Sequence, residues 1–158
     1  VGSDGKVDLY NYNGSADAVV DVSGWFTDGS VASATGSSFA PTGPSRVADT
    51  RAGSNEPDAG MTLGAGGSVT VPVTGVAGVP TGAAAVVVNV TVTDTTGASF
   101  LTVYPTGVTR PLASDLNWVA GTTRANLAVV HPGPDGTITV FNHSSSVDVI
   151  VDVTGYYK

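Results

Sequence analysis

Residues 133–157 read GPDGTITVFNHSSSVDVIVDVTGYY, and residues 2–26 read GSDGKVDLYNYNGSADAVVDVSGWF. The two stretches align without a gap at an offset of 131 residues, and ten of the 25 aligned positions are identical. A period of this length corresponds to a whole domain. The sequence therefore predicts one complete repeat, residues 39–158, preceded by the end of another repeat, residues 1–26.

Both copies have the pattern of a two-stranded unit. Residues 7–12 and 16–23 alternate in the manner of strands around Asn13-Gly14, a dipeptide that favours a tight hairpin turn. Residues 137–142 and 146–154 repeat the pattern and predict a closing hairpin. A lone hairpin is barely stable in water, so we expect the first copy to pair with an exposed sheet edge of a neighbouring copy. The apolar residues expected to carry this strand donation are Val7, Leu9, Val20 and Val22.

Between the copies, residues 27–38 are small and polar, which predicts a flexible linker. From residue 39 onward the chain shows strand periodicity, with a short strand at about 45–50 and a glycine-rich loop over 52–67. The most regular alternation, Val86 to Val92, predicts a strand in the middle of a sheet.

No segment has a helical period. About eight strands in this stretch predict an all-β fold, an antiparallel two-sheet β-sandwich of jelly-roll or immunoglobulin-like type.

Composition excludes several classes of partner. The formal net charge is −7, from 13 acidic and six basic residues, which disfavours nucleic acid and anionic membrane surfaces. The chain has no cysteine, so neither disulfides nor thiolate chemistry is expected. Its longest purely apolar run, residues 83–88, is too short to cross a bilayer, and we expect no membrane insertion.

Six motifs together resemble a repeat module of secreted and cell-surface proteins of high-GC Gram-positive and related bacteria. They are SRVADTR (45–51), GVAGVP (75–80), AVVVNVTVT (85–93), FLTVYP (100–105), ANL (125–127) and DVTGYY (152–157). The module often occurs in tandem, sometimes beside cell-wall hydrolase domains. The resemblance implies a secreted or cell-surface location and structural or adhesive work without catalysis. The implied partners are copies of the chain itself or neighbouring repeats.

Acidic residues recur four apart in both copies, as Asp17/Asp21 and Asp148/Asp152. In a strand this spacing puts both carboxylates on one face about 13 Å apart, too far for one calcium ion. A calcium site completed by loop residues is one interpretation. The other, which we favour, is that the carboxylates pair with arginines or cap a neighbouring strand. The structural candidates are Arg46, Arg51, Asp148 and Asp152, and a buried Arg51–Asp152 pair is the sharpest form of this prediction.

Aromatic residues offer an alternative function, binding of carbohydrate or cell wall. Trp118 is the best candidate for stacking on a sugar ring, with Tyr104 and Asn117 as further candidates. Packing in the core or at an interface is the competing interpretation for the aromatic residues, Tyr156 and Trp25 in particular, which stand beside a glycine in both copies.

Catalysis has little support. His143 corresponds to Tyr12 in the first copy, a replacement that a metal ligand or general base does not tolerate. The chain has no Gly-x-Ser-x-Gly motif, and Glu56, its one glutamate, lies in the glycine-rich loop. We therefore expect no enzyme and no cofactor. The leading hypothesis is a structural repeat of an extracellular stalk, fibre or filament that acts by end-to-end assembly of β domains.

Overall fold

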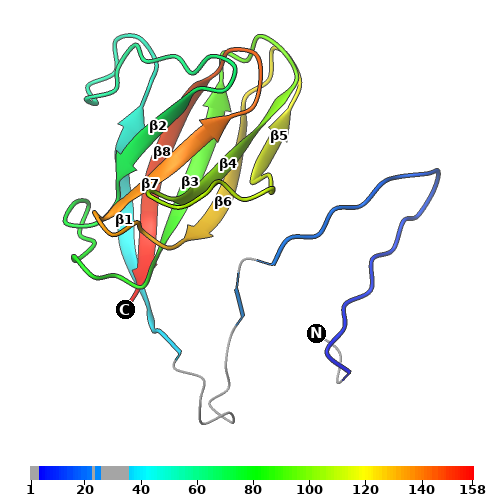
Figure 1. The fold of residues 1–158 in the computed structure, drawn as a ribbon, viewed down its shortest axis with the longest axis horizontal. Helices are drawn as coiled ribbons and strands as arrows, with labels where there is room; N and C mark the ends of the chain where they lie inside the picture. Colours follow the sequence, from blue (N-terminus) through cyan, green and yellow to red (C-terminus); the bar gives the residue numbers. More distant parts are fainter. Residues whose placement is uncertain (1–3, 23, 26–35) are drawn as a thin grey trace.

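In the computed structural model of the chain, residues 4–22, 24–25 and 36–158 are described. Eight strands form two four-stranded antiparallel sheets, with strand orders β1-β8-β3-β6 and β2-β7-β4-β5. Their bounds are β1 Phe39–Asp49, β2 Ser68–Pro72, β3 Ala85–Thr93, β4 Ser99–Pro105, β5 Leu116–Trp118, β6 Arg124–Val130, β7 Thr137–Asn142 and β8 Asp148–Tyr157. The sheets lie face to face (Figure 1), which confirms the predicted all-β, two-sheet sandwich.

The core is built from small aliphatic side chains that both sheets turn inward. Alternate residues of β3, from Val86 to Val92, are no more than 2 % exposed, and β3 lies between β8 and β6 as its regular alternation predicts. From the other sheet, Leu101, Ile138 and Val140 are fully buried against them. Valine suits this position because its branched side chain packs well on a pleated surface.

The predicted closing hairpin is wrong. β7 pairs with β2 and β4, whereas β8 pairs with β1 and β3, so the two last strands lie in different sheets. The connection from Asn142 to Asp148 is an arch over the end of the sandwich and not a hairpin turn. The physical reason is that both strands are apolar on one face and each buries that face, from opposite sides, in one core.

Asn142 holds this arch. Its side chain is fully buried and donates hydrogen bonds from Nδ2 to the carbonyl oxygens of Leu63, Gly64 and Ser145, at 3.1, 3.0 and 3.0 Å. Ser145 has a positive φ of 61°, a conformation that few non-glycine residues adopt. The amide of one asparagine thus fixes the turn and ties the 50–67 loop to it.

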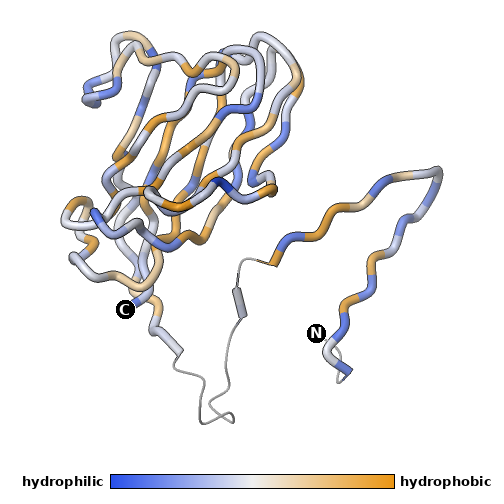
Figure 2. Tube along the Cα trace, in the orientation of Figure 1, coloured by the Kyte–Doolittle hydropathy of each residue, from blue (hydrophilic) through white to orange (hydrophobic). Residues whose placement is uncertain are grey.

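The N-terminal segment lies outside the sandwich. Within the described residues 4–22 and 24–25, no strand is assigned, so the hairpin predicted over 7–12 and 16–23 is not formed there. Figure 1 shows two extended arms on either side of a bend, and Figure 2 shows hydrophobic stretches along them. Residues 27–35 of the linker predicted over 27–38 lie outside the described residues.

The first and last residues of the sandwich lie at the same end of it. The backbone of Ser38 and that of Lys158 exchange two hydrogen bonds, 3.0 and 3.1 Å long, and Phe39 is the β-ladder partner of Tyr157. The sandwich therefore begins at the boundary expected near residue 38, and its first and last residues are neighbours in one sheet.

The other strand bounds follow the sequence with local differences. β1 starts at Phe39, several residues earlier than predicted, because β8 runs beside it to Tyr157. The register of this edge strand is irregular between Pro41 and Ser45, which accommodates its prolines, and again between Arg46 and Ala48. β5 is the shortest strand, with three residues.

The aromatic ring that packs over Gly155 is that of Phe39 and not that of the adjacent Tyr156. A Cβ at position 155 would lie 2.5 Å from two atoms of the Phe39 ring and 2.9 Å from the carbonyl oxygen of Ala40. Phe39 also contacts Tyr157, with ring centroids 5.4 Å apart. Gly155 thus lets β1 and β8 approach closely at their shared end.

We expect Gly155→Ala to lower the free energy of unfolding by about 2–3 kcal/mol, because the added methyl group forces the ring and the β1 backbone apart. Denaturant titration followed by tryptophan fluorescence measures the loss. The matched control is Gly24→Ala at the equivalent position of the first copy, where no atom of the described residues lies within 4 Å of the added atom. Equal stability of the two variants would contradict the packing described here.

Candidate functional site

A charged cluster spans the end of β1 and the middle of β8. Arg46 Nε lies 3.0 Å from Asp152 Oδ1, and its Nη1 lies 3.1 Å from Asp49 Oδ2. Arg51 holds Asp49 with two hydrogen bonds, from Nη2 to Oδ2 at 2.7 Å and from Nε to Oδ1 at 2.9 Å. Asp49 therefore accepts from two guanidinium groups, one of them in the bidentate geometry that makes such pairs strong.

Strand register explains which side chains meet. Arg46 and Asp152 are ladder partners, and the register irregularity after Arg46 separates this pair from the next, Ala48 with Val151. Of the two β8 carboxylates, Asp152 pairs with Arg46, as the arginine-pairing interpretation expects, and Asp148 has other partners. The prediction of a buried Arg51–Asp152 pair is wrong. Arg51 lies beyond the end of β1, and its partner is Asp49, the last residue of β1.

Asp148 has hydroxyl partners in place of an arginine. Its Oδ1 accepts from Thr50 Oγ1 at 3.1 Å and from Thr62 Oγ1 at 2.8 Å, and the residue is 8 % exposed. Thr50 Oγ1 in turn accepts from the backbone amide of Val149 at 2.8 Å. The residue thus ties the start of β8 to the end of β1 and to the 50–67 loop, as the strand-capping interpretation expects.

The charges of this cluster shift pKa values in known directions. The hydrogen bonds from Arg51, and the charges of Arg51 and Arg46, hold the pKa of Asp49 below its ordinary value, although burial opposes them. Hydrogen bonding to Asp152 raises the pKa of Arg46, and hydrogen bonding to Asp49 raises that of Arg51. Folding therefore favours the ionised form of Asp49.

A second carboxyl group is shifted the other way. Burial raises the pKa of Asp115, against the hydrogen bond of 2.7 Å that its Oδ2 accepts from the backbone amide of Val103. Folding therefore favours the protonated form of Asp115, and the stability that follows is lost as the pH rises through the raised pKa. Asp115 directly precedes β5, and its hydrogen bond to Val103 ties this end of the 106–115 loop to β4.

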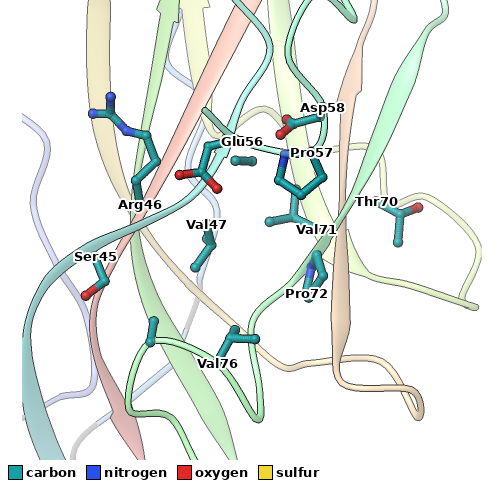
Figure 3. Close-up of a pocket in the computed structure, with 12 residues that line it drawn as sticks. Ser45, Arg46, Val47, Glu56, Pro57, Asp58, Thr70, Val71, Pro72 and Val76 are labelled. Atoms are coloured by element: carbon teal, nitrogen blue, oxygen red, sulfur yellow. The ribbon is translucent and has the colours of Figure 1, made fainter. Parts of the chain in front are cut away.

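A groove of about 450 Å³ lies beside the charged cluster, between β1 and β2 at the edge of the sandwich. Figure 3 shows its wall, in which aliphatic side chains such as Val47, Val71 and Val76 stand below the charged groups of Arg46 and Glu56. Asp58 closes one end. Its Oδ1 accepts from the amide of Asp49 at 3.3 Å, and its Oδ2 is buried without a hydrogen-bond partner among the described residues.

The groove lacks the nucleophile and adjacent base that acyl transfer by a triad requires. Ser45 is the lining residue with a hydroxyl on the β1 side, and it donates to the carbonyl oxygen of Gly43 at 3.2 Å. No histidine or cysteine lines the groove. Of the two histidines, His143 stacks on Phe100, with centroids 4.5 Å apart. A nucleophile with an adjacent base is thus missing from this site.

The calcium interpretation has no acidic cluster behind it in the part of the chain that is described. Among these residues no group of three histidine, cysteine or acidic side chains is close enough to hold a metal ion.

The described part of the chain also contains no long apolar helix of the kind that spans a membrane.

The carbohydrate candidates do not gather on one surface. Trp118 is 5 % exposed and belongs to the core, and within the described part of the chain its Nε1 has no hydrogen-bond partner. Its ring therefore offers no free face to a sugar. Asn117, the next residue along β5, is exposed on the other face and donates to Ser114 Oγ at 3.1 Å. Tyr104 is half-buried on β4, beyond the stretch that pairs with β5.

The side chains of the strand-donation candidates are exposed to solvent. Val7, Leu9, Val20 and Val22 are 62 %, 68 %, 58 % and 87 % exposed. Their equivalents in β7 and β8, at an offset of 131 residues, are Ile138, Val140, Val151 and Val153, all fully buried.

The first copy nevertheless has the turns of the second. Asn11 Nδ2 donates to the carbonyl oxygen of Gly14 at 2.9 Å, as Asn142 donates to Ser145 at 3.0 Å. The amide of Lys6 donates to Asp4 Oδ1 at 3.2 Å, as that of Thr137 donates to Asp135 at 3.1 Å. Gly5 and Gly136 have φ angles of 77° and 78°. The local conformation is therefore encoded in the segment itself.

Sequence reasoning missed two residues of the charged site, Asp49 and Asp58. Asp49 stands within SRVADTR, three residues after one arginine and two before another, and this spacing around a strand end was a usable signal. Asp58 lies in an aperiodic loop, and nothing in its surroundings predicts its bond to Asp49.

No protein-family model matches this chain, and no curated protein matches it. The charged cluster and its groove must therefore be interpreted from their own geometry. That geometry fastens the start of β8, the end of β1 and the 50–67 loop together, which is a structural task.

We expect Asp49→Asn to lower the free energy of unfolding at neutral pH by about 2 kcal/mol, because two guanidinium groups lose their shared carboxylate. The loss depends on pH. A lowered pKa stabilises the fold above the ordinary aspartate value, near 3.9, and the benefit is lost as the pH falls through the lowered value.

Urea titrations at several pH values measure this effect. The difference between Asp49→Asn and the parent chain should be largest near neutrality and shrink below about pH 4. The matched control is Asp135→Asn, an exposed carboxylate whose pKa is also lowered but by the hydroxyl of Thr137. A difference that stays constant from pH 7 to pH 3 would show that the charge of Asp49 is not what matters.

Proposed function

We propose that the chain is a structural repeat of an extracellular stalk, fibre or filament, and that it works without catalysis. The observation that carries the proposal is that residues 2–26 repeat the sequence of the closing strands, 133–157, at an offset of one domain. The turn hydrogen bonds of the two segments also correspond. A unit that recurs in this way is a link in a series. The likeness of the six sequence motifs to a tandem module of bacterial surface proteins supports the same proposal, and with it the secreted or cell-surface location.

The way the chain enters and leaves the domain shapes how such a series is built. Ser38 and Lys158 are hydrogen-bonded neighbours, so both connections to adjacent repeats leave from one end of the sandwich. An end-to-end row of domains then needs non-covalent contacts at the opposite end, where the 143–147 arch and the 94–98 loop lie. The mechanical unit is the sandwich, and the partners are other copies of it.

The charged cluster gives the unit its resistance to pulling. β1 and β8 are the first and last strands, they pair along most of their length, and a force applied at the two ends acts across this pair. Arg46–Asp152 and the hydroxyl bonds of Asp148 join the same two strands at their middle and far end. Separating the termini therefore opens the ladder from the end that holds Phe39 and Gly155.

Electron microscopy of cells that produce the protein tests the proposal, with antibodies against residues 39–158 as the label. We expect label at regular intervals along extracellular fibres, because each repeat contributes one domain. Label confined to the cell interior, or scattered over the wall without fibres, would contradict it.

A glycan array tests the alternative, a carbohydrate- or wall-binding module. We expect no binding above background, since Trp118 is buried. Specific binding that is lost in Asn117→Ala, which removes an exposed side chain and one hydrogen bond, would favour the alternative instead.

A further inference from the structure

The chain contains two copies of the closing strands and one copy of the strands that receive them. β7 and β8 occupy slots between β2 and β4 in one sheet and between β1 and β3 in the other. We propose that residues 4–26 fit the same two slots of the domain that follows them, so that the two copies exchange and the copy at 137–157 is released when the first copy is bound.

The inward-facing residues of the first copy match the slots. Val20 and Val22 are identical to Val151 and Val153, which are fully buried in β8. In the other sheet, Val7 and Leu9 take the places of Ile138 and Val140, with aliphatic side chains of similar volume. Such swaps are the best tolerated in a core.

The polar requirements of the slots are also met. The three carbonyl groups that Asn142 satisfies need a buried amide, and Asn11 stands at the equivalent position. Asp21 corresponds to Asp152, the partner of Arg46, and Asp17 corresponds to Asp148, the acceptor for Thr50 and Thr62. The buried amide at the arch and the two carboxylates of β8 therefore have equivalents in the first copy.

The close approach at Gly155 sets a further condition that the first copy meets. Any side chain at this position clashes with the Phe39 ring and with the carbonyl oxygen of Ala40. Gly24 is the equivalent residue, although nothing lies near it in the present arrangement. The same holds for the turns at Gly5 and at Asn11–Gly14, which already have the conformation of their counterparts.

Chain connectivity allows the exchange within one molecule. The end of β8 lies beside the start of β1, where Tyr157 is the ladder partner of Phe39. Phe26 corresponds to Tyr157, and residues 27–38 separate it from Phe39 in the sequence. Adjacent strand ends are about 5 Å apart, a distance that a connection of this length spans with ease. The permuted domain then runs from the first copy through β1 to β6.

The present arrangement prevails because the second copy fits better. Val149 is fully buried, and its equivalent Ala18 leaves part of that space empty. His143 stacks on Phe100, and the first copy has Tyr12 there. The exchanged arrangement is therefore a minor state. It becomes populated when the packing of residues 137–157 is weakened or when these residues bind elsewhere. In a tandem array, each closing unit can serve the domain before it or the domain after it.

Disulfide trapping in the full chain tests the exchange, because the chain has no cysteine of its own. Val90 and Val151 are ladder partners on β3 and β8, so Val90→Cys with Val151→Cys should form a disulfide in the present arrangement. Val90→Cys with Val20→Cys should form one only when the first copy occupies the slot. The matched control is Val90→Cys with Val19→Cys, which shares the same tether but faces the other side of the strand.

We expect the 20–90 disulfide to form in monomers several-fold faster than the 19–90 control under mild oxidation. Asn142→Ala should accelerate it further, since it weakens the competing copy alone, and Asn11→Ala should slow it to the control rate. Equal rates for the 20–90 and 19–90 pairs would overturn the exchange, and so would a 20–90 disulfide found only in dimers.

The comparison of the two cysteine pairs with Asn142 intact decides the question even if Asn142→Ala does not fold. A negative result would leave the structural-repeat proposal standing, because closing strands that serve only their own domain still make a repeat. Failure to find fibres, in turn, would not affect the disulfide result.

Discussion

Insertion of the last two strands into the middle of both sheets is the constraint on which this fold depends. β8 fills the space between β1 and β3, and β7 fills the space between β2 and β4. Without β7 and β8 neither sheet is continuous, because β1 pairs with β8 and β2 pairs with β7. The core is made of valine and alanine more than of large side chains, so its cohesion comes from many small contacts across two complete sheets. The end of the chain therefore determines whether the rest of the domain can fold.

Buried polar groups add specific connections between segments to the packing of the valine core. Asn142 satisfies three carbonyl groups at the arch, and Asp148 accepts from two threonine hydroxyls where β8 starts. Asp49 gathers two arginines at the end of β1. These interactions lie along the line where β1, β8 and the 50–67 loop meet, and each has a buried or half-buried partner that leaves a cost if it is removed alone. The groove beside them is a consequence of this architecture, since it lies where the edges of the two sheets diverge.

The sequence predicts the fold class and most strands because period-two patterns of valine are strong over residues 86–92, 137–142 and 148–154. It does not predict the partner of each strand. A five-residue connection after Asn142 suits a hairpin and an arch equally well, and the pattern says that each strand buries one face without saying in which sheet. For the same reason the sequence could show that Arg46 and Arg51 need carboxylates but not that Asp49 lies between them. Trp118 stands in a strand of three residues, too short for alternation to show which way it points. The repeat of residues 2–26, by contrast, was visible at once, and its turns match those of 133–157 in detail.

Amide hydrogen exchange of the intact chain measures the central claim most directly. If the closing strands complete both sheets, amides of β7 and β8 should be among the slowest to exchange, with protection close to that of β3, and those of residues 7–12 and 16–22 should exchange as fast as an unfolded chain. Fast exchange of β8 while β3 stays protected, or strong protection of residues 7–12 and 16–22 in the major state, would contradict the account.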